Sequence, residues 1–166
     1  MPTKLGSALA IVSLAAAAFI VAPAFAEERS CRGALGAVTV DNLRVPQGAT
    51  CRLNGTRIKG TLQVQRGATL RASRIRVVGN IHAEGAANVN VARSRIIGSI
   101  QVVQGRNSKL TRNTVNHDVQ YFENRGVISI ARNRIDGNLQ CKENRRRPVG
   151  GGNRVQGVKE DQCAGL

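Results

Sequence analysis

The chain has 166 residues and a formal net charge of +15 at pH 7, but only one Tyr, three Phe and no Trp. A two-layer globular core usually draws on large aromatic side chains for its buried area, so this composition argues against that design. We expect instead an interior of many small layers built from Val, Ile, Leu and Ala.

Residues 1–26 have the pattern of a secretory signal peptide. Lys4 is followed by the apolar run LAIVSLAAAAFIV and then by the small-residue stretch APAFA, which ends at Ala26. The run is short for a membrane span of about 20 residues, and no charge cluster follows it. We therefore expect cleavage after Ala26, no transmembrane span, and export to the periplasm or the extracellular space. Residues 27–166 then form one domain.

From Asn42 onward the sequence repeats. Four copies of 19 residues begin at Asn42, Thr61, Asn80 and Ser99, and two copies of 20 residues follow. Each copy has three pairs of apolar or small residues spaced i, i+2, as in short strands that turn two side chains to one face. The sequence therefore predicts an all-β, single-stranded parallel β-helix of about seven coils, each of 19–20 residues with three short strands.

The third strand of each copy indicates how the coil bends. One of its inward columns contains Thr56, Ile75, Ser94, Asn113, Asn133 and Asn153. We expect the asparagines to stack inside a bend and to hydrogen bond along the coil axis. The spacing of inward positions is irregular, whereas a left-handed hexapeptide helix requires a regular period of six residues. We therefore favour a right-handed coil.

Glycine and asparagine mark the turns in two columns. One contains Gly60, Gly79, Gly98, Gly137 and Gly157, and the other contains Gly48, Gly67, Gly105, Asn124 and Asn144. These residue types accept positive φ, so we expect left-handed conformations at both columns. His117 takes a glycine position, and we interpret it as a left-handed turn residue rather than as a ligand or catalytic base.

The four cysteines lie near the two ends of the repeat. Cys31 precedes Cys51 by 20 residues and Cys141 precedes Cys163 by 22, about one coil in each case. Strands one coil apart lie about 4.8 Å from each other, within the Cα separation that a disulfide accepts. We expect the bonds Cys31–Cys51 and Cys141–Cys163, which suppress fraying of the end coils. Without CxxC spacing we expect no zinc site, and we assign no metal or cofactor.

The segment RRRPVGGG, residues 145–152, replaces the middle strand of the last copy. Proline cannot donate a ladder hydrogen bond and glycine weakens a strand, so we expect strand pairing to stop there.

Arginine fills two outward columns that flank the third strand. Its planar guanidinium suits bidentate contact with phosphate, sulfate or carboxylate, and we expect these columns to form one anion-binding face. The alternative is that these arginines only form a solvated sheet edge that prevents aggregation. The candidate anion-binding residues are Arg57, Arg74, Arg76, Arg93, Arg95, Arg112, Arg132 and Arg134.

The expected partners are lipopolysaccharide, teichoic acid or an acidic polysaccharide. Nucleic acid is disfavoured because the aromatic platforms of single-strand binders are missing. Another outward column runs through Arg44, Gln63, His82, Gln101, Gln120 and Gln140. It is either a sugar-binding face or, as we favour, a polar ladder with hydrogen bonds between rungs.

An enzyme is the least favoured alternative. Glycoside hydrolysis needs two facing carboxylates, and lyases of this architecture commonly use clustered acids. The acids here are scattered, except that Glu123 stacks over Glu143. Arg125 and Arg145 follow these glutamates, so we expect ion pairs and assign no catalytic residue.

The C-terminal pieces NLQCKEN, GGGN and KEDQC resemble a motif of exported bacterial short-coil β-helix proteins that brings no known activity. The bare coil without cap helices is more remotely similar to the bactofilins, which polymerise end to end. This second resemblance implies a self-assembling homo-oligomer as the alternative function. Bactofilins are mainly cytoplasmic, lack a cleaved signal and do not rely on disulfides, and the present sequence departs from them in these respects.

Overall fold

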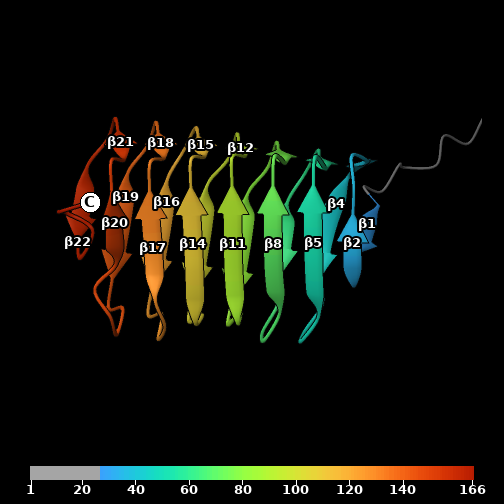
Figure 1. Ribbon diagram of the computed structural model, residues 1–166, viewed down its shortest axis with the longest axis horizontal. Coiled ribbons are helices and arrows are strands. Elements are labelled where there is room, and N and C mark those ends of the chain that lie inside the picture. Colours follow the sequence, from blue (N-terminus) through green and yellow to red (C-terminus); the bar gives the residue numbers. More distant parts are fainter. Residues whose placement is uncertain (1–26) are drawn as a thin grey trace, which may run out of the picture.

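The computed structural model describes residues 27–166 as a parallel β-helix of three sheets (Figure 1). The chain passes from sheet A to sheet B to sheet C in each coil, so all neighbouring strands are parallel. In Figure 1 the strands of sheet B run upward at the front, the chain crosses over the top, and each next coil lies further left, which is a right-handed coil. The predicted signal peptide lies outside the described residues. Within residues 27–166, no helix is long and apolar enough to cross a membrane.

Sheet A pairs eight strands in chain order. Alternate residues face the interior, for example Leu43 and Val45, because side chains along a strand alternate between its two faces. The strands are β1 (Glu28–Ser30), β4 (Asn42–Val45), β7 (Leu62–Val64), β10 (Ile81–Glu84), β13 (Ile100–Val103), β16 (Val119–Phe122), β19 (Leu139–Lys142) and β22 (Lys159–Asp161).

Sheet B pairs seven strands. They are β2 (Gly33–Leu35), β5 (Thr50–Asn54), β8 (Thr69–Ser73), β11 (Asn88–Ala92), β14 (Asn107–Thr111), β17 (Ile128–Ala131) and β20 (Val149–Gly151). Those of the central coils, β5, β8, β11 and β14, have five residues each. The prediction that pairing stops in RRRPVGGG is wrong, because β20 pairs with β17. Pro148 lies just outside the strand. Gly150 approaches β17 so closely that a Cβ would collide with the carbonyl oxygen of Ile130.

Sheet C is built from two-residue strands. They are β3 (Thr39–Val40), β6 (Arg57–Ile58), β9 (Arg76–Val77), β12 (Arg95–Ile96), β15 (Thr114–Val115), β18 (Arg134–Ile135) and β21 (Arg154–Val155). The second residue of each strand faces the interior and the first faces solvent. Three strands per coil and 19–20 residues per repeat are confirmed.

The interior is a continuous stack of aliphatic side chains with one buried aromatic residue, Tyr121. Its hydroxyl lies 2.7 Å from Oγ of Ser108, and that Oγ donates to the carbonyl of Val89 at 3.0 Å. Because the serine has one hydroxyl proton, Tyr121 donates to Ser108. Burial raises the pKa of Tyr121 well above its usual range. The small serine therefore provides both room and a partner for the phenol of the next coil.

The asparagine stack is confirmed at the bend between sheets B and C. Oδ1 of Asn133 accepts from the backbone N–H of Asn113 at 2.9 Å, and its side-chain amide donates to the carbonyl of Leu110 at 3.0 Å. A second stack, formed by Asn124 and Asn144, occupies the bend between sheets A and B. These two residues were expected in the left-handed region, but they are buried interior residues outside it.

The column that begins at Gly60 was also predicted to be left-handed, and this is wrong for its glycines and for His117. Its glycines make space instead. Oδ1 of Asn80 accepts from the N–H of Ser99 at 2.8 Å, and a Cβ on Gly98 would collide with that oxygen. Ser99 takes the place of Asn80 in the next coil, where its Oγ accepts from the N–H of Asp118 at 3.3 Å. In the other predicted column, Gly48 and Gly67 do have positive φ, 67° and 68°, but Gly105 does not.

Both predicted disulfides are present. Cys31 and Cys51 have a Cα–Cα distance of 5.6 Å, and Cys141 and Cys163 have one of 5.2 Å. The bonded residues are not register partners, because Gly33 pairs with Cys51 and Asp161 pairs with Cys141. Each bond therefore joins neighbouring coils with an offset of two residues.

Candidate anion-binding groove

A column of arginines follows the sheet B strands at the bend into sheet C. Arg74, Arg93, Arg112 and Arg132 have φ of 54°, 50°, 56° and 57°. Left-handed backbone costs a residue with a Cβ about 1–2 kcal/mol. The same column ends in Gly55 and Gly152, with φ of 72° and 67°. This backbone position favours glycine, yet the four central coils have arginine.

The repeat alignment predicts that these arginines lie beside the inward pair of the third strand. The structure corrects this, because the strands of sheet C are only two residues long and begin after the bend. The bend turns the arginine column toward sheet B, where Arg93 and Arg112 line a hollow.

Short side chains form the floor of this hollow. They occupy the last outward position of each sheet B strand and are aligned by the strand register, from Ser73 to Gly151. We call this column the groove floor. It consists of Ser73, Ala92, Thr111, Ala131 and Gly151.

A second basic column lies on the other side of the groove floor. It is the central outward column of sheet B. In chain order this column contains Arg52, Arg71, Asn90, Lys109 and Ser129, of which Asn90 and Ser129 are neutral. One hollow is lined by these three basic residues together with Arg93 and Arg112. A second hollow begins at Lys109 and Thr111 and continues to Arg132 and Gly152. Because the two hollows share Lys109 and Thr111, one groove follows the coil axis.

The two ends of the groove differ. At the N-terminal end, Nε and Nη2 of Arg74 each lie 3.3 Å from Oδ1 of Asn54, so these side chains meet over the line of the floor. At the C-terminal end, Gly151 and Gly152 carry no side chain. Side chains therefore cover the floor at the N-terminal end and leave it uncovered at the C-terminal end.

Positive charge is concentrated on this side of the molecule. The sheet B and sheet C segments 50–58, 69–77, 88–96, 107–115, 128–135 and 149–155 contain 12 Lys and Arg and no Asp or Glu. The acids of residues 27–166 lie on sheet A or in the turns beside it. Of the 12 basic residues only Arg134 has an ion-pair partner within the described chain, Asp136 at 3.1 Å. The groove cations are thus not neutralised internally.

The predicted anion-binding residues fall into two groups. Arg93, Arg112 and Arg132 line the groove, and Arg74 lies at its N-terminal end. Arg57, Arg76, Arg95 and Arg134 lie on the outer face of sheet C, where the first three are consecutive register partners, and they line neither hollow.

Sequence reasoning missed Arg52, Arg71 and Lys109, which form the opposite wall. Each stands between the two inward residues of a middle strand, as in LRA at 70–72. That position must face outward, so the signal was present in the repeat alignment.

The outward column of sheet A is self-contained. The side-chain amide of Gln101 donates to Gln120 at 3.4 Å, that of Gln120 to Gln140 at 2.9 Å, and that of Gln140 to Glu160 at 2.9 Å. The prediction of a polar ladder is therefore confirmed.

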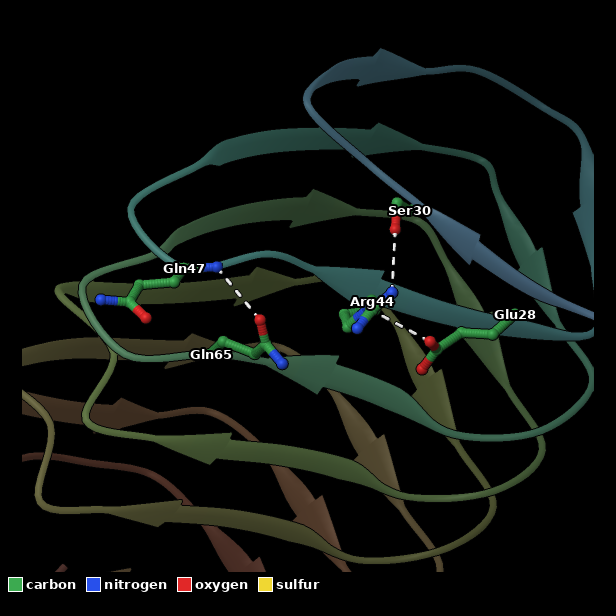
Figure 2. Close-up of polar contacts among 5 residues, drawn as sticks. All are labelled: Glu28, Ser30, Arg44, Gln47 and Gln65. Atoms are coloured by element: carbon green, nitrogen blue, oxygen red, sulfur yellow. Dashed lines mark hydrogen bonds and ion pairs between the residues drawn. The ribbon is translucent and has the colours of Figure 1, made fainter.

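Arg44 begins the same column at the N-terminal end. It contacts Glu28 at 3.1 Å and Ser30 at 3.5 Å, and Figure 2 shows these residues together with the nearby bond from the N–H of Gln47 to Gln65. Arg44 thus holds the first strand of sheet A rather than facing the groove.

The predicted ion pairs of Glu123 and Glu143 with Arg125 and Arg145 are not found among the described residues. Glu123 accepts from the side-chain amide of Gln104 at 2.8 Å, and Glu143 lies 3.9 Å from Nζ of Lys142. Both glutamates occupy left-handed bends between sheets A and B, away from the groove. Residues 27–166 contain no group of three or more His, Cys, Asp or Glu side chains placed to hold a metal ion.

No family model, curated protein or solved structure matches this chain. Function must therefore be inferred from the chemistry of the groove. Two rows of cationic donors above a floor of small side chains suit a narrow, extended ligand with repeated negative charges.

Proposed function

We propose that this is an exported, non-enzymatic protein that binds a linear polyanion in the groove between sheet B and the arginine bend. The proposal rests on two basic walls, the central outward column of sheet B and the arginine bend, which face each other across small side chains. The cations of both walls have no carboxylate partner within the described chain. Envelope and extracellular polymers of this chemistry are lipopolysaccharide, teichoic acid and acidic polysaccharides.

Two features support export. The N-terminal 26 residues have the pattern of a signal peptide. Both pairs of cysteines are joined as disulfides, which persist in oxidising compartments such as the periplasm and the extracellular space.

The choice of side chain at the arginine bend favours binding over a merely solubilising role. The bend between sheets A and B has the same left-handed position and fills it with Gln104, Glu123 and Glu143, so the backbone alone does not explain arginine. A charged surface that only prevents aggregation would be served equally by lysine or glutamate, whereas this bend has arginine in four successive coils. Arginine is also the side chain best suited to bidentate contact with oxyanions.

Binding without turnover is favoured by the side chains of the groove. Hydrolysis of a sugar chain needs two carboxylates on opposite sides of the bond. The groove is lined by guanidinium, ammonium, amide, hydroxyl and methyl groups, and the acids of the described residues lie on the far side of the coil.

The test compares two triple variants that remove the same charge. The groove variant is Arg71→Gln, Arg93→Gln and Arg112→Gln. The control variant on sheet C is Arg57→Gln, Arg76→Gln and Arg95→Gln. Retention on immobilised heparin and the dissociation constant at several salt concentrations are measured, with circular dichroism to confirm folding.

We expect the groove variant to bind about tenfold more weakly, because three partly exposed charge contacts are worth roughly 0.5 kcal/mol each. Its affinity should also depend less steeply on salt. The control should change less than about threefold, the general effect of lower net charge. Equal losses in both variants, or no loss in either, would contradict the proposal.

A further inference from the structure

We infer that the polyanion is an acidic polysaccharide that lies along the coil axis with one sugar ring per coil. This inference rests on the proposed function and specifies its ligand and the direction in which the ligand lies.

The direction follows from the continuity of the groove. The two hollows adjoin at Lys109 and Thr111, and their lining residues run from Arg52 of β5 to Gly151 of β20. A ligand that crossed the coil axis would have to pass over a row of arginines. A ligand along the axis meets a cation at each coil from Arg74 to Arg132.

The two ends of the groove differ in access. Arg74 and Asn54 meet over the N-terminal end, whereas Gly151 and Gly152 carry no side chain at the C-terminal end. A long polymer therefore leaves the groove most freely at the C-terminal end.

The width of the groove fits one chain. The floor residue Ser73 lies two positions after the wall residue Arg71 on the same strand, a separation of about 7 Å. The opposite wall, Arg74, follows immediately. A single polymer chain fits this width, whereas a duplex does not.

The floor suits sugar rings better than other polyanions. Ala92, Thr111 and Ala131 present small apolar surfaces, and Ser73 adds a hydroxyl, whereas the hydroxyl oxygen of Thr111 is buried. The C–H faces of pyranose rings pack on such surfaces, and ring hydroxyls bond to such a hydroxyl. Polyphosphate has no apolar face. Single-stranded nucleic acid needs aromatic stacking platforms, and no aromatic residue lines either hollow.

The spacing of the walls matches a sugar polymer. Neighbouring coils are about 4.8 Å apart, so the five floor positions span about 19 Å. This spacing is close to the length of one ring in an extended polysaccharide. From β8 onward the sheet B wall alternates basic and neutral, with Arg71, Asn90, Lys109 and Ser129. Such alternation matches a polymer whose repeating unit has two sugars with the acid on one of them.

The experiment uses hyaluronan oligosaccharides of two, four, six and eight rings, and oligophosphates of equal charge. Dissociation constants are measured by calorimetry for the disulfide-bonded protein, residues 27–166. We expect affinity to rise at least tenfold from two to six rings and less than twofold from six to eight. At equal charge, oligophosphate should bind at least fivefold more weakly than the six-ring sugar.

A floor variant separates ring packing from charge. Ala92→Phe fills the groove without altering charge, and Thr114→Phe on the outer face of sheet C is the matched control. We expect Ala92→Phe to weaken six-ring binding at least fivefold and Thr114→Phe to leave it unchanged. Circular dichroism and the retained disulfides verify that both variants fold.

The outcomes distinguish the two proposals. If oligophosphate binds as well as the sugar, or if affinity stops rising at two rings, the inference of an axial polysaccharide is overturned. The proposed function still stands in that case, provided that the groove triple variant weakens the binding of both ligands. If the groove triple variant weakens neither, both proposals fail.

Discussion

Sheet A and the groove present two different uses of a repeated polar column. On sheet A, glutamines in successive coils donate to one another, and the series ends on the carboxylate of Glu160. In the groove, successive residues are arginines, which have donors and no acceptor. Amides therefore satisfy each other along the coil, whereas guanidiniums leave their donors for a ligand. The same scaffold thus supports a structural face and the proposed binding face, and the side-chain chemistry of each column distinguishes them.

The largest expected effect concerns the interior ladder beneath the arginine bend. Asn133→Ala removes the partners of the Asn113 N–H and of the Leu110 carbonyl. Because both groups are buried, we expect a loss of about 3 kcal/mol in the free energy of unfolding. Urea unfolding measures it, with exposed Asn54→Ala as the control. A loss below about 1 kcal/mol would show that the bend under the binding face does not depend on this ladder.

The next effect concerns the hydrogen bond that joins the two faces through the core. Ser108 belongs to β14 in sheet B and Tyr121 to β16 in sheet A. Ser108→Ala leaves the buried phenol without its partner, and we expect a loss of about 2 kcal/mol in the free energy of unfolding. Tyr121→Phe removes the donor itself and should cost less, about 1 kcal/mol.

The same tyrosine predicts alkaline sensitivity. Burial raises the pKa of Tyr121 above the usual value of 10.0, so the phenol stays protonated in the folded protein while the unfolded chain ionises. The stabilisation is complete below about pH 10 and falls above it by up to about 1.4 kcal/mol per pH unit. Thermal unfolding between pH 8 and pH 12 measures it. Tyr121→Phe should remove this part of the decline, and an unchanged pH profile in that variant would contradict the assignment.

A smaller effect tests the difference between the glutamine column of sheet A, whose side chains hydrogen bond to one another, and the basic column of the groove, whose side chains do not. Gln120→Ala breaks two ladder bonds on sheet A and should cost about 0.5–1 kcal/mol. Arg71→Ala, the matched change in the groove, should be neutral or slightly stabilising, because Arg52 lies directly beside it. Equal losses in the free energy of unfolding for both variants would contradict this distinction between the two columns.

The smallest effect on stability should accompany a clear effect on binding. Arg93→Gly relieves the left-handed backbone but increases the freedom of the unfolded chain, so we expect a net gain of about 0.5 kcal/mol. Affinity for heparin should fall about threefold at the same time. A variant that is less stable and binds normally would indicate that Arg93 serves the fold rather than a ligand.

Much of the fold could be predicted because the repeat fixes which residues face inward. The strand columns, the stacked asparagines and both disulfides follow from placing one copy over the next. The reason for the glycines at the turn into sheet A could not be predicted from the residue type alone. Glycine tolerates both positive φ and close approach, and only the contact between Gly98 and Asn80 shows that space is the reason.

The candidate site was predicted in part. Arginine columns are visible in the alignment, but the sequence does not show that Arg74 lies in a bend while Arg76 lies in a strand. A left-handed residue turns the chain by a large angle, and one such bend separates the two columns onto different faces. The opposite wall at Arg71 and Lys109 becomes meaningful only once that bend brings the Arg93 column beside it.

The most direct test of the binding face is to observe the arginines during titration with ligand. Side-chain N–H resonances of 15N-labelled protein can be followed as a six-ring hyaluronan oligosaccharide is added. The account predicts that the largest shifts occur at Arg71, Arg93 and Arg112, while Arg57, Arg76 and Arg95 change little. Shifts of equal size on both sets, or shifts confined to the glutamine ladder of sheet A, would contradict it.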